Sequence, residues 1–305
     1  DLIGVINTQG TGGEPRKYGH VAKMKSNGVE IALNTVNIKT KDFTWTTDLI
    51  YSHMHNEVTE LNTLNNMYEY ISGYGFTMPG YPQRSLFSIP FMGLNNEGLP
   101  TFLDQDGNVS VTGINMQEYD PEKLKFLKYE GPTDPTDVGS LGNVFRYKGV
   151  TLNLFITYSF GNVVRLDPVF SSSYSDLTAT PKEFKDRWVK PGDENFTNVP
   201  VIASKQQLNN IAFLSRAYQA YNYSTERVAK GDFIRMKEIS LAYEFPKSIT
   251  QPLRLSNLSL KLMATNLFLI YADKKLNGQD PEFFNAGGVA NPMPKQFTLT
   301  LKFGI

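Results

Sequence analysis

The sequence predicts an all-β fold, a transmembrane antiparallel up-and-down β-barrel with long extracellular loops. Three observations support this prediction: apolar and polar residues alternate in seven segments, short and long connections alternate between these segments, and most segments are about 10 to 13 residues long. A strand of that length, rising about 3.3 Å per residue and tilted by about 40°, spans an apolar band roughly 25 Å tall.

Each expected strand has one apolar and one polar face, because successive side chains of a strand point to opposite sides of the sheet. The clearest example is 295–305, in which Leu299 and other apolar residues alternate with Thr300 and other polar ones. Within 28–40 the apolar parity changes, which predicts a β-bulge near Asn34. The other expected strands are 42–56, 140–149, 149–161, 232–246 and 256–268.

The connections between the expected strands alternate in length. Compact soluble domains seldom contain loops longer than about 15 residues, whereas outer-membrane barrels combine short periplasmic turns with long extracellular loops. The alternation therefore predicts extracellular long loops and a C-terminus on the periplasmic side. The short connections are 39–42, 147–149 and 246–252, and the long ones are 59–139, 162–231 and 272–294.

The polar face of the strands does not by itself distinguish a barrel from a soluble β-sandwich. Glu238 and Lys261 would face a wet lumen in a barrel and bulk water in a sandwich. The strand length favours the barrel, because sandwich strands typically have about 5–6 residues. Aromatic residues near the strand ends fit the interfacial girdles of a barrel. These residues are Trp45, Tyr51, Tyr158, Phe160, Tyr243 and Phe245.

The composition excludes several classes of function. The 305 residues carry Lys+Arg 30 and Asp+Glu 30, so the chain lacks the basic excess of a nucleic-acid-binding protein. With Cys 0, it can form no disulfide, thiolate nucleophile or Cys-ligated metal site. No phosphate-binding loop, nucleophile elbow or zinc-protease motif occurs in the sequence. We therefore expect neither an enzyme nor a cofactor.

Two short motifs resemble metal sites. The acidic spacing of 104–108 is that of a calcium loop, but the twelfth position of that loop needs a glutamate where Asn115 stands. We therefore expect a hairpin turn. His53 and His55 lie on one strand face without a third ligand nearby in the sequence, so we expect a pair at a strand end and no metal site.

The long loops contain expected secondary structure of their own. Turn signals within 85–109 predict one or two short hairpins. The segment 180–188 begins like a helix, with Thr180 as N-cap and Pro181 at the first helical position. Apolar residues recur every third position in 206–218, which predicts a second helix.

Aromatic side chains of the long loops are the candidate substrate contacts. Their rings combine a flat apolar face with a polar tip, which suits contact with sugar rings and with peptide side chains. The alternative is that they pack the loops against one another. The candidates are Tyr68, Tyr70, Tyr74, Tyr221 and Tyr223.

Several stretches, spread over nearly the whole chain, together resemble one known family. They are NGVEIALNTVNIKTKDFTW (27–45), GYPQRSLFSIPFMGLNNEGLPTFLDQDG (80–107), EGPTDPTDVGSLGNVFRYKGVTLNLFITYSFGN (130–162), RWVKPGDEN (187–195), YNYSTERVAKGDFIRMKEISLAYEFP (221–246) and LMATNLFLIY (262–271). In this order and spacing they resemble the C-terminal part of a SusC/RagA-like TonB-dependent outer-membrane transporter.

The resemblance implies a plugged barrel of 22 strands, with residues 1–305 as its C-terminal portion supplying about seven or eight of them. It also implies a SusD-like surface lipoprotein as partner, a glycan or peptide substrate, energy delivered through the TonB complex, and a dimer of the transporter–lid pair. The plug domain, the segment that contacts TonB and the earlier strands are expected outside this sequence. The final residue of the family is commonly aromatic, whereas Ile305 stands here and Phe303 is one same-face step earlier.

Two alternatives from other classes stay open. In a secreted, soluble β-rich glycan-binding protein, the same alternation would build a sandwich whose loops bind sugar. A passive porin would share the barrel but take up solutes independently of TonB. A barrel of either kind needs detergent to stay in solution, which the soluble protein does not.

Overall fold

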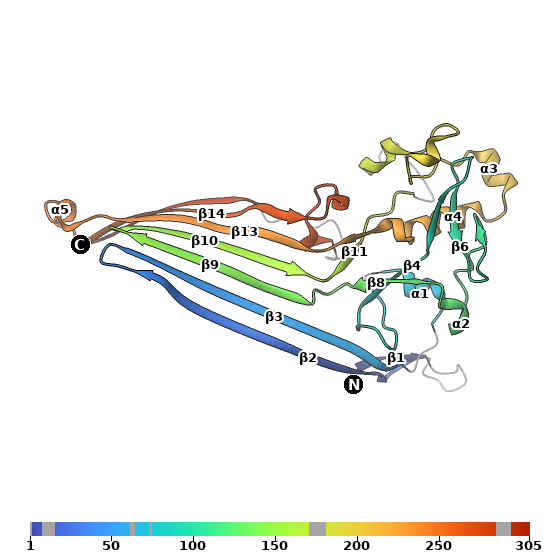
Figure 1. The fold of residues 1–305 in the computed structure, drawn as a ribbon, viewed down its shortest axis with the longest axis horizontal. Helices are drawn as coiled ribbons and strands as arrows, with labels where there is room; N and C mark the ends of the chain where they lie inside the picture. The colour runs from blue at the N-terminus through green and yellow to red at the C-terminus, as the bar shows by residue number, and fades with distance from the viewer. Residues whose placement is uncertain (1, 8–15, 62–64, 74, 171–180, 285–293) are drawn as a thin grey trace.

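The structure is a computed structural model dominated by one antiparallel sheet of eight strands (Figure 1). It describes residues 2–7, 16–61, 65–73, 75–170, 181–284 and 294–305. Neighbouring strands of the sheet follow one another along the chain in an up-and-down order, and the described sheet is open, with β1 and β15 at its edges. The predicted all-β fold is confirmed. The strands are β1 (Leu2–Asn7), β2 (Arg16–Lys39), β3 (Phe43–Leu61), β9 (Asp137–Tyr147), β10 (Val150–Phe160), β13 (Phe233–Glu244), β14 (Asn257–Ala272) and β15 (Gln296–Gly304).

All seven predicted strands are present, and one strand and part of another were not predicted. The unpredicted parts are β1 and the first half of β2, which precedes Gly28. Charged and polar residues occupy both faces of 16–27, so no apolar alternation marks this stretch. Its pairing with β3 nevertheless continues as far as Ala22 opposite Leu61.

The β-bulge of β2 lies further along the strand than predicted. Val36 pairs with Thr46 and Ile38 pairs with Trp45, so the extra residue is Asn37 and the expected position near Asn34 is wrong. Val36 precedes the bulge and lies on the polar face with Thr46. Because Val36 is apolar, the sequence pattern placed the change of face too early. The Asn37 side chain donates a hydrogen bond of 2.6 Å to Oγ1 of Thr47 on the neighbouring strand.

The cross-strand register gathers the apolar side chains of six strands on one face. In one row of directly paired residues, which runs from β3 to β15, all six side chains are apolar. The adjacent row lies on the opposite face and is mostly polar. The apolar row is Trp45, Phe145, Leu152, Leu241, Leu262 and Leu299, and the polar-face row is Thr44, Arg146, Thr151, Ala242, Lys261 and Thr300.

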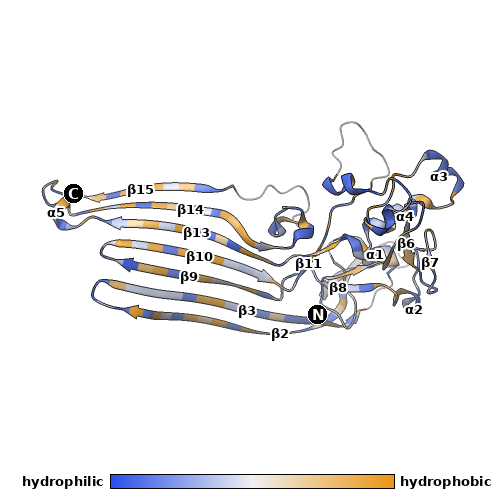
Figure 2. Ribbon diagram, turned by 45° about the horizontal axis from the view of Figure 1, so that its top comes forward, coloured by the Kyte–Doolittle hydropathy of each residue, from blue (hydrophilic) through white to orange (hydrophobic). Residues whose placement is uncertain are grey.

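The apolar face has no protein cover in the described part of the chain. Val29, Leu241 and Leu299 on this face are 56%, 47% and 66% exposed. In a β-sandwich a second sheet would bury such residues, whereas in a membrane barrel they meet lipid. Figure 2 shows hydrophobic and hydrophilic residues alternating along these bare strands. The arrangement favours the barrel over the soluble alternative.

Short and long connections lie at opposite ends of the sheet, as predicted (Figure 1). The turn between β9 and β10 consists of Lys148 and Gly149, both with positive φ (45° and 87°), which is typical of a tight hairpin turn. The connection between β13 and β14 carries the helix α5 (Lys247–Thr250). The C-terminus lies at this end, where the backbone of Ser256 donates to the Gly304 carbonyl. None of the described helices is long and apolar enough to cross a membrane.

The other end of the sheet carries the long connections, which fold into a separate body. We call the described residues of 65–136 and 161–232 the cap. The predicted hairpins within 85–109 are confirmed as β5, β6 and β7 in one small sheet. The elements of the cap are β4 (Ser85–Ser88), β5 (Phe91–Leu94), β6 (Pro100–Leu103), β7 (Val109–Ser110), β8 (Lys128–Pro132), β11 (Val163–Arg165), β12 (Val228–Lys230), α1 (Met67–Ile71), α2 (Pro121–Leu124), α3 (Lys205–Asn210), α4 (Leu214–Asn222), and the 3₁₀ turns η1 (Lys182–Asp186), η2 (Asp193–Asn195) and η3 (Thr225–Arg227).

The two predicted cap helices differ from the observed ones. The single helix expected over 206–218 is two helices, because Phe213 adopts a left-handed conformation (φ 64°) between α3 and α4. Apolar spacing at every third residue cannot reveal such a break. The helix expected over 180–188 is the short 3₁₀ turn η1, preceded by Pro181, and its expected N-cap Thr180 lies outside the described residues.

The assignment of one face of β15 to lipid and the other to the lumen predicts that arginine destabilises the folded barrel by different amounts at two adjacent positions. In the complete protein, Leu299→Arg places a charge on the lipid face and should cost roughly 2–4 kcal/mol near the membrane midplane. Thr300→Arg should cost much less, because its cross-strand neighbour Lys261 shows that the polar face already accommodates a basic side chain. The amount of folded barrel in outer-membrane extracts measures both effects. Equal losses for the two variants would contradict the face assignment.

Candidate functional site

The cap contains the main hydrophobic core of the described chain. Its buried residues come from both long loops, so the two loops pack against each other. The first long loop also covers Val58 near the end of β3, whose backbone hydrogen-bonds with Gly80 and Tyr81. The candidate substrate contacts all belong to these loops, and their positions in or around this core decide what each can touch. The buried core residues are Met67, Ile71, Ile89, Leu99, Phe102, Ile114, Met116, Leu124, Val169, Phe170, Leu214, Ala217, Tyr218, Ala220 and Tyr221.

Tyr221, on α4, is a packing residue in this structure. Its side chain is completely buried (0% exposed), with ring centroids 5.5 Å from Phe91 and 5.6 Å from Phe170. Burial raises the pKa of its hydroxyl, against the opposing charge of Arg227. These contacts correspond to the alternative that loop aromatics pack the loops together. For Tyr221, a contact with substrate stays a prediction.

Tyr68 and Tyr223 meet across the two long loops. Their hydroxyl oxygens are 3.4 Å apart and their rings are perpendicular, with centroids 5.8 Å apart. Both side chains are half-buried, so part of each ring is accessible from outside. Burial, together with the neighbouring Tyr68, raises the pKa of Tyr223 to about 12. For Tyr68 and Tyr223, a contact with substrate stays a prediction.

Arg165, at the end of β11, links the two long loops through hydrogen bonds in the same region. The sequence did not predict this role. Its guanidinium donates to the Phe87 carbonyl (2.6 Å), to Ser88 Oγ (3.2 Å) and to the Ser224 carbonyl (3.4 Å). It also lies over the ring of Tyr223, 5.7 Å from the centroid. Burial of the guanidinium lowers the pKa of Arg165 to about 10, partly offset by the charge of Glu130. No sequence pattern marks this arginine, because its partners are distant in the chain.

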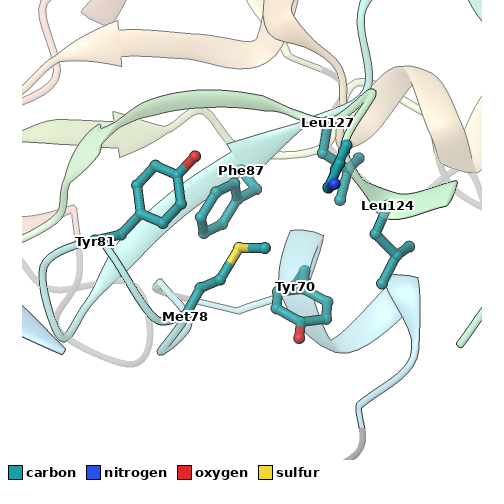
Figure 3. A pocket seen from close by; sticks show the side chains of 7 residues that line it. Tyr70, Met78, Tyr81, Phe87, Leu124 and Leu127 are labelled. Atoms are coloured by element: carbon teal, nitrogen blue, oxygen red, sulfur yellow. The ribbon is translucent and has the colours of Figure 1, made fainter. Parts of the chain in front are cut away.

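Tyr70 borders a small cavity on the side of the first long loop (Figure 3). The cavity volume is about 80 Å³, well below the several hundred Å³ typical of a small-molecule site. Its other lining residues include Met78, Tyr81, Phe87 and Leu124. The cavity has room for a side-chain-sized group and is too small for an oligomer. The remaining candidate, Tyr74, lies outside the described residues.

Of the two metal-like motifs, 104–108 is confirmed as a hairpin turn, whereas His53 and His55 lie within β3 and not at its end, because the strand continues to Leu61. Nδ1 of His53 lies 2.8 Å from Oδ1 of Asp137, which also accepts a hydrogen bond of 2.8 Å from the Tyr51 hydroxyl. The carboxylate of Asp104 accepts from the backbone N–H groups of Asp106 (3.0 Å) and Asn108 (2.9 Å), which closes the turn between β6 and β7. Across the described ranges, His, Asp and Glu side chains form no cluster of three or more that could hold a metal ion.

Arg165 provides a test of how the cap is held together. Arg165→Met removes the donor from three acceptors and should cost the cap roughly 2–3 kcal/mol, since those acceptors lose their partner in a partly buried place. Hydrogen exchange in the full-length protein should accelerate at 85–88 and around Ser224 and stay unchanged in β14. Arg216→Met is the matched control, because Arg216 of α4 is exposed and its guanidinium lies over the ring of Phe213, 4.4 Å from the centroid. Unchanged exchange in Arg165→Met would contradict the assignment.

Comparisons with known proteins find similar chains, although no protein-family model matches this one. In sequence the chain is similar to three TonB-dependent receptors of Formosa agariphila: P39 (25% identity over 90% of this chain and 29% of the receptor), P3 (24%, 86% and 26%) and P26 (24%, 92% and 29%). The chain thus spans less than a third of the length of these curated relatives.

In fold the chain is similar to solved structures of the RagAB peptide importer in two conformational states. The match to the 'open-open' state has a TM-score of 0.71 at 19% identity and covers 100% of this chain and 31% of that chain. The match to the 'closed-closed' state has a TM-score of 0.70 at 21% identity and covers 99% and 32%. The sequence likeness and the shared fold together support the predicted resemblance to part of a SusC/RagA-like TonB-dependent outer-membrane transporter.

Proposed function

We propose that the chain forms part of the barrel of an active importer that brings nutrient oligomers across the outer membrane. Energy would be delivered through TonB, and a SusD-like surface lipoprotein would act as the lid. The observation that carries the proposal is the fold match to a peptide importer over the whole chain, at a TM-score of 0.71. The sequence likeness to TonB-dependent receptors over 90% of the chain supports the coupling to TonB.

The proposal gives each face of the sheet a separate task. The apolar face holds the wall in lipid, and the polar face lines the path of the solute. Glu238 on the polar face accepts a hydrogen bond from Asn153 Nδ2 (3.1 Å), and its carboxylate lies 3.8 Å from Lys261 Nζ. Lys261 thus offsets the negative charge of Glu238 at this place on the lumen face.

The cap would receive both the substrate and the lid. Tyr68 and Tyr223 offer half-buried aromatic rings to a sugar or a peptide side chain. Three apolar side chains of the second long loop are exposed and could each contact a protein partner: Val189 (67% exposed), Phe196 (91%) and Phe213 (58%). Apolar side chains with this much exposure on an extracellular loop are favourable where a partner covers them. The substrate is a glycan fragment or a peptide, and both suit the aromatic pair.

Dependence on energy distinguishes the proposal from the passive porin. In the native host, deletion of the full-length gene should abolish uptake of the oligomer and complementation should restore it. Loss of TonB or collapse of the proton gradient should abolish uptake as well. Uptake that continues without TonB would favour the porin. The lipoprotein lid should copurify with the full-length protein in detergent, and its consistent absence would contradict the partnership.

The two kinds of loop tyrosine should respond differently to truncation. Tyr68→Ala should raise the oligomer concentration for half-maximal uptake about tenfold, a loss of roughly 1.4 kcal/mol of binding, with a normal amount of folded protein. Tyr221→Ala should instead lower the amount of folded protein, because removing a buried aromatic ring costs about 3–5 kcal/mol. Both quantities can be measured on the same membranes. Normal uptake by Tyr68→Ala would remove this tyrosine from the substrate contacts.

A further inference from the structure

A β-bulge in β13 turns one arginine from the lipid face to the lumen face. Opposite β10, Glu238 pairs with Phe155 and Met236 pairs with Ile156, so Lys237 is an extra residue without a partner in the ladder. Such a bulge shifts the alternation of side chains by one residue. Arg235 therefore lies on the same face as Glu238, although the two positions differ by an odd number of residues.

On the lumen face, Arg235 meets two carboxylates from the loop between β14 and β15. Its Nη2 atom lies 2.5 Å from Oδ1 of Asp280, and its Nε atom lies 3.2 Å from Oε2 of Glu282. The arginine is only 6% exposed. Its guanidinium carbon lies 5.5 Å from the ring centroid of Phe233 on the same strand. The arginine is thus enclosed between the large sheet and the loop that connects β14 to β15.

The segment that supplies these carboxylates, residues 273–284, is also fixed to the second long loop. It consists mainly of two 3₁₀ turns, η4 (Lys274–Leu276) and η5 (Pro281–Phe283). Leu276 is buried against Val164, Leu166 and Ala229. The Asp273 carboxylate accepts a hydrogen bond of 2.8 Å from the backbone N–H of Lys230 at the end of β12. The segment therefore lies against both the large sheet and the two-stranded sheet of β11 and β12.

We propose that Arg235 is a positioning residue that clamps segment 273–284 on the lumen side of the wall, where the segment narrows the solute path. The inference rests on the proposed transport function and adds a determinant of substrate size. The carboxylates can reach Arg235 only from the lumen side, because its side chain lies on the polar face of β13. The exposed residues of the segment, which include Asn277 and Gln279, then border the path as hydrogen-bonding groups.

The clamp is fixed and does not open during transport. Removing one member of a buried ion pair leaves an uncompensated charge, so the open form is strongly disfavoured. A second contact strengthens this argument, since Gln279 Nε2 lies 3.4 Å from Oδ2 of Asp167 in the cap. A loosened segment should therefore widen the path and change which oligomer lengths are imported, with little effect on the sheet.

The test compares Arg235→Gln with the matched control Lys237→Gln in the full-length transporter. Arg235→Gln should accelerate hydrogen exchange in 273–284 at least tenfold and leave β10 and β15 unchanged. It should also raise several-fold the uptake of the longest accepted oligomer relative to the shortest one. Lys237→Gln should change neither quantity. The double variant Arg235→Gln/Asp280→Asn removes both charges of the contact between these two residues. It should show the same altered length profile as Arg235→Gln. It should retain more folded protein, because Asp280 no longer leaves an unpaired charge.

Two results would overturn the clamp. Exchange that rises equally in all strands of Arg235→Gln would mean that the arginine stabilises the whole sheet. A loosened segment with an unchanged length profile would mean that the segment does not border the solute path. If the wild-type protein imports no oligomer, the proposed function fails, while the exchange experiment still decides whether Arg235 holds the segment.

Discussion

The structure depends on the cross-strand register of its large sheet. The side-chain period of a strand is two, so a slip of one residue would move every side chain of that strand to the other face. From Trp45 to Leu299 the register brings six apolar side chains into one row. Nothing in the described chain covers that row, so the surroundings of the sheet have to supply the apolar environment. Lipid meets this requirement and water does not.

A second consequence concerns the cap, which needs a core of its own. Because the apolar face of the sheet is turned to lipid and the other face is mostly polar, the sheet offers the long loops few apolar side chains to pack against, apart from places such as Val58 at the end of β3. The loops bury one another instead, with Tyr221 completely enclosed and Arg165 bridging 85–88 to Ser224. The cap can therefore vary to suit a substrate or a lid while the register of the wall stays the same. The large sheet and the cap thus fold by different contacts, because the two faces of the sheet meet different environments.

Sequence alone predicted the wall well and the cap poorly, for a physical reason. Alternation marks a strand when one face meets an apolar medium, and it was absent from 16–27, where both faces are polar. The packing of a loop aromatic depends on residues from another loop, so the local sequence did not separate buried Tyr221 from half-buried Tyr68. The break at Phe213 and the contacts of Arg165 depend on tertiary packing in the same way.

The alternation fails where the backbone inserts an extra residue, and these places have consequences for function. Continuing the alternation of β13 outward from Ile239 would place Arg235 on the lipid face, where a charged side chain is unfavourable. One bulged residue at Lys237 turns that arginine toward Asp280, which is distant in the sequence. A single backbone irregularity thus converts an unfavourable position into an attachment point for a loop. In a sheet whose two faces meet different media, such irregularities decide which side chains reach the solute path.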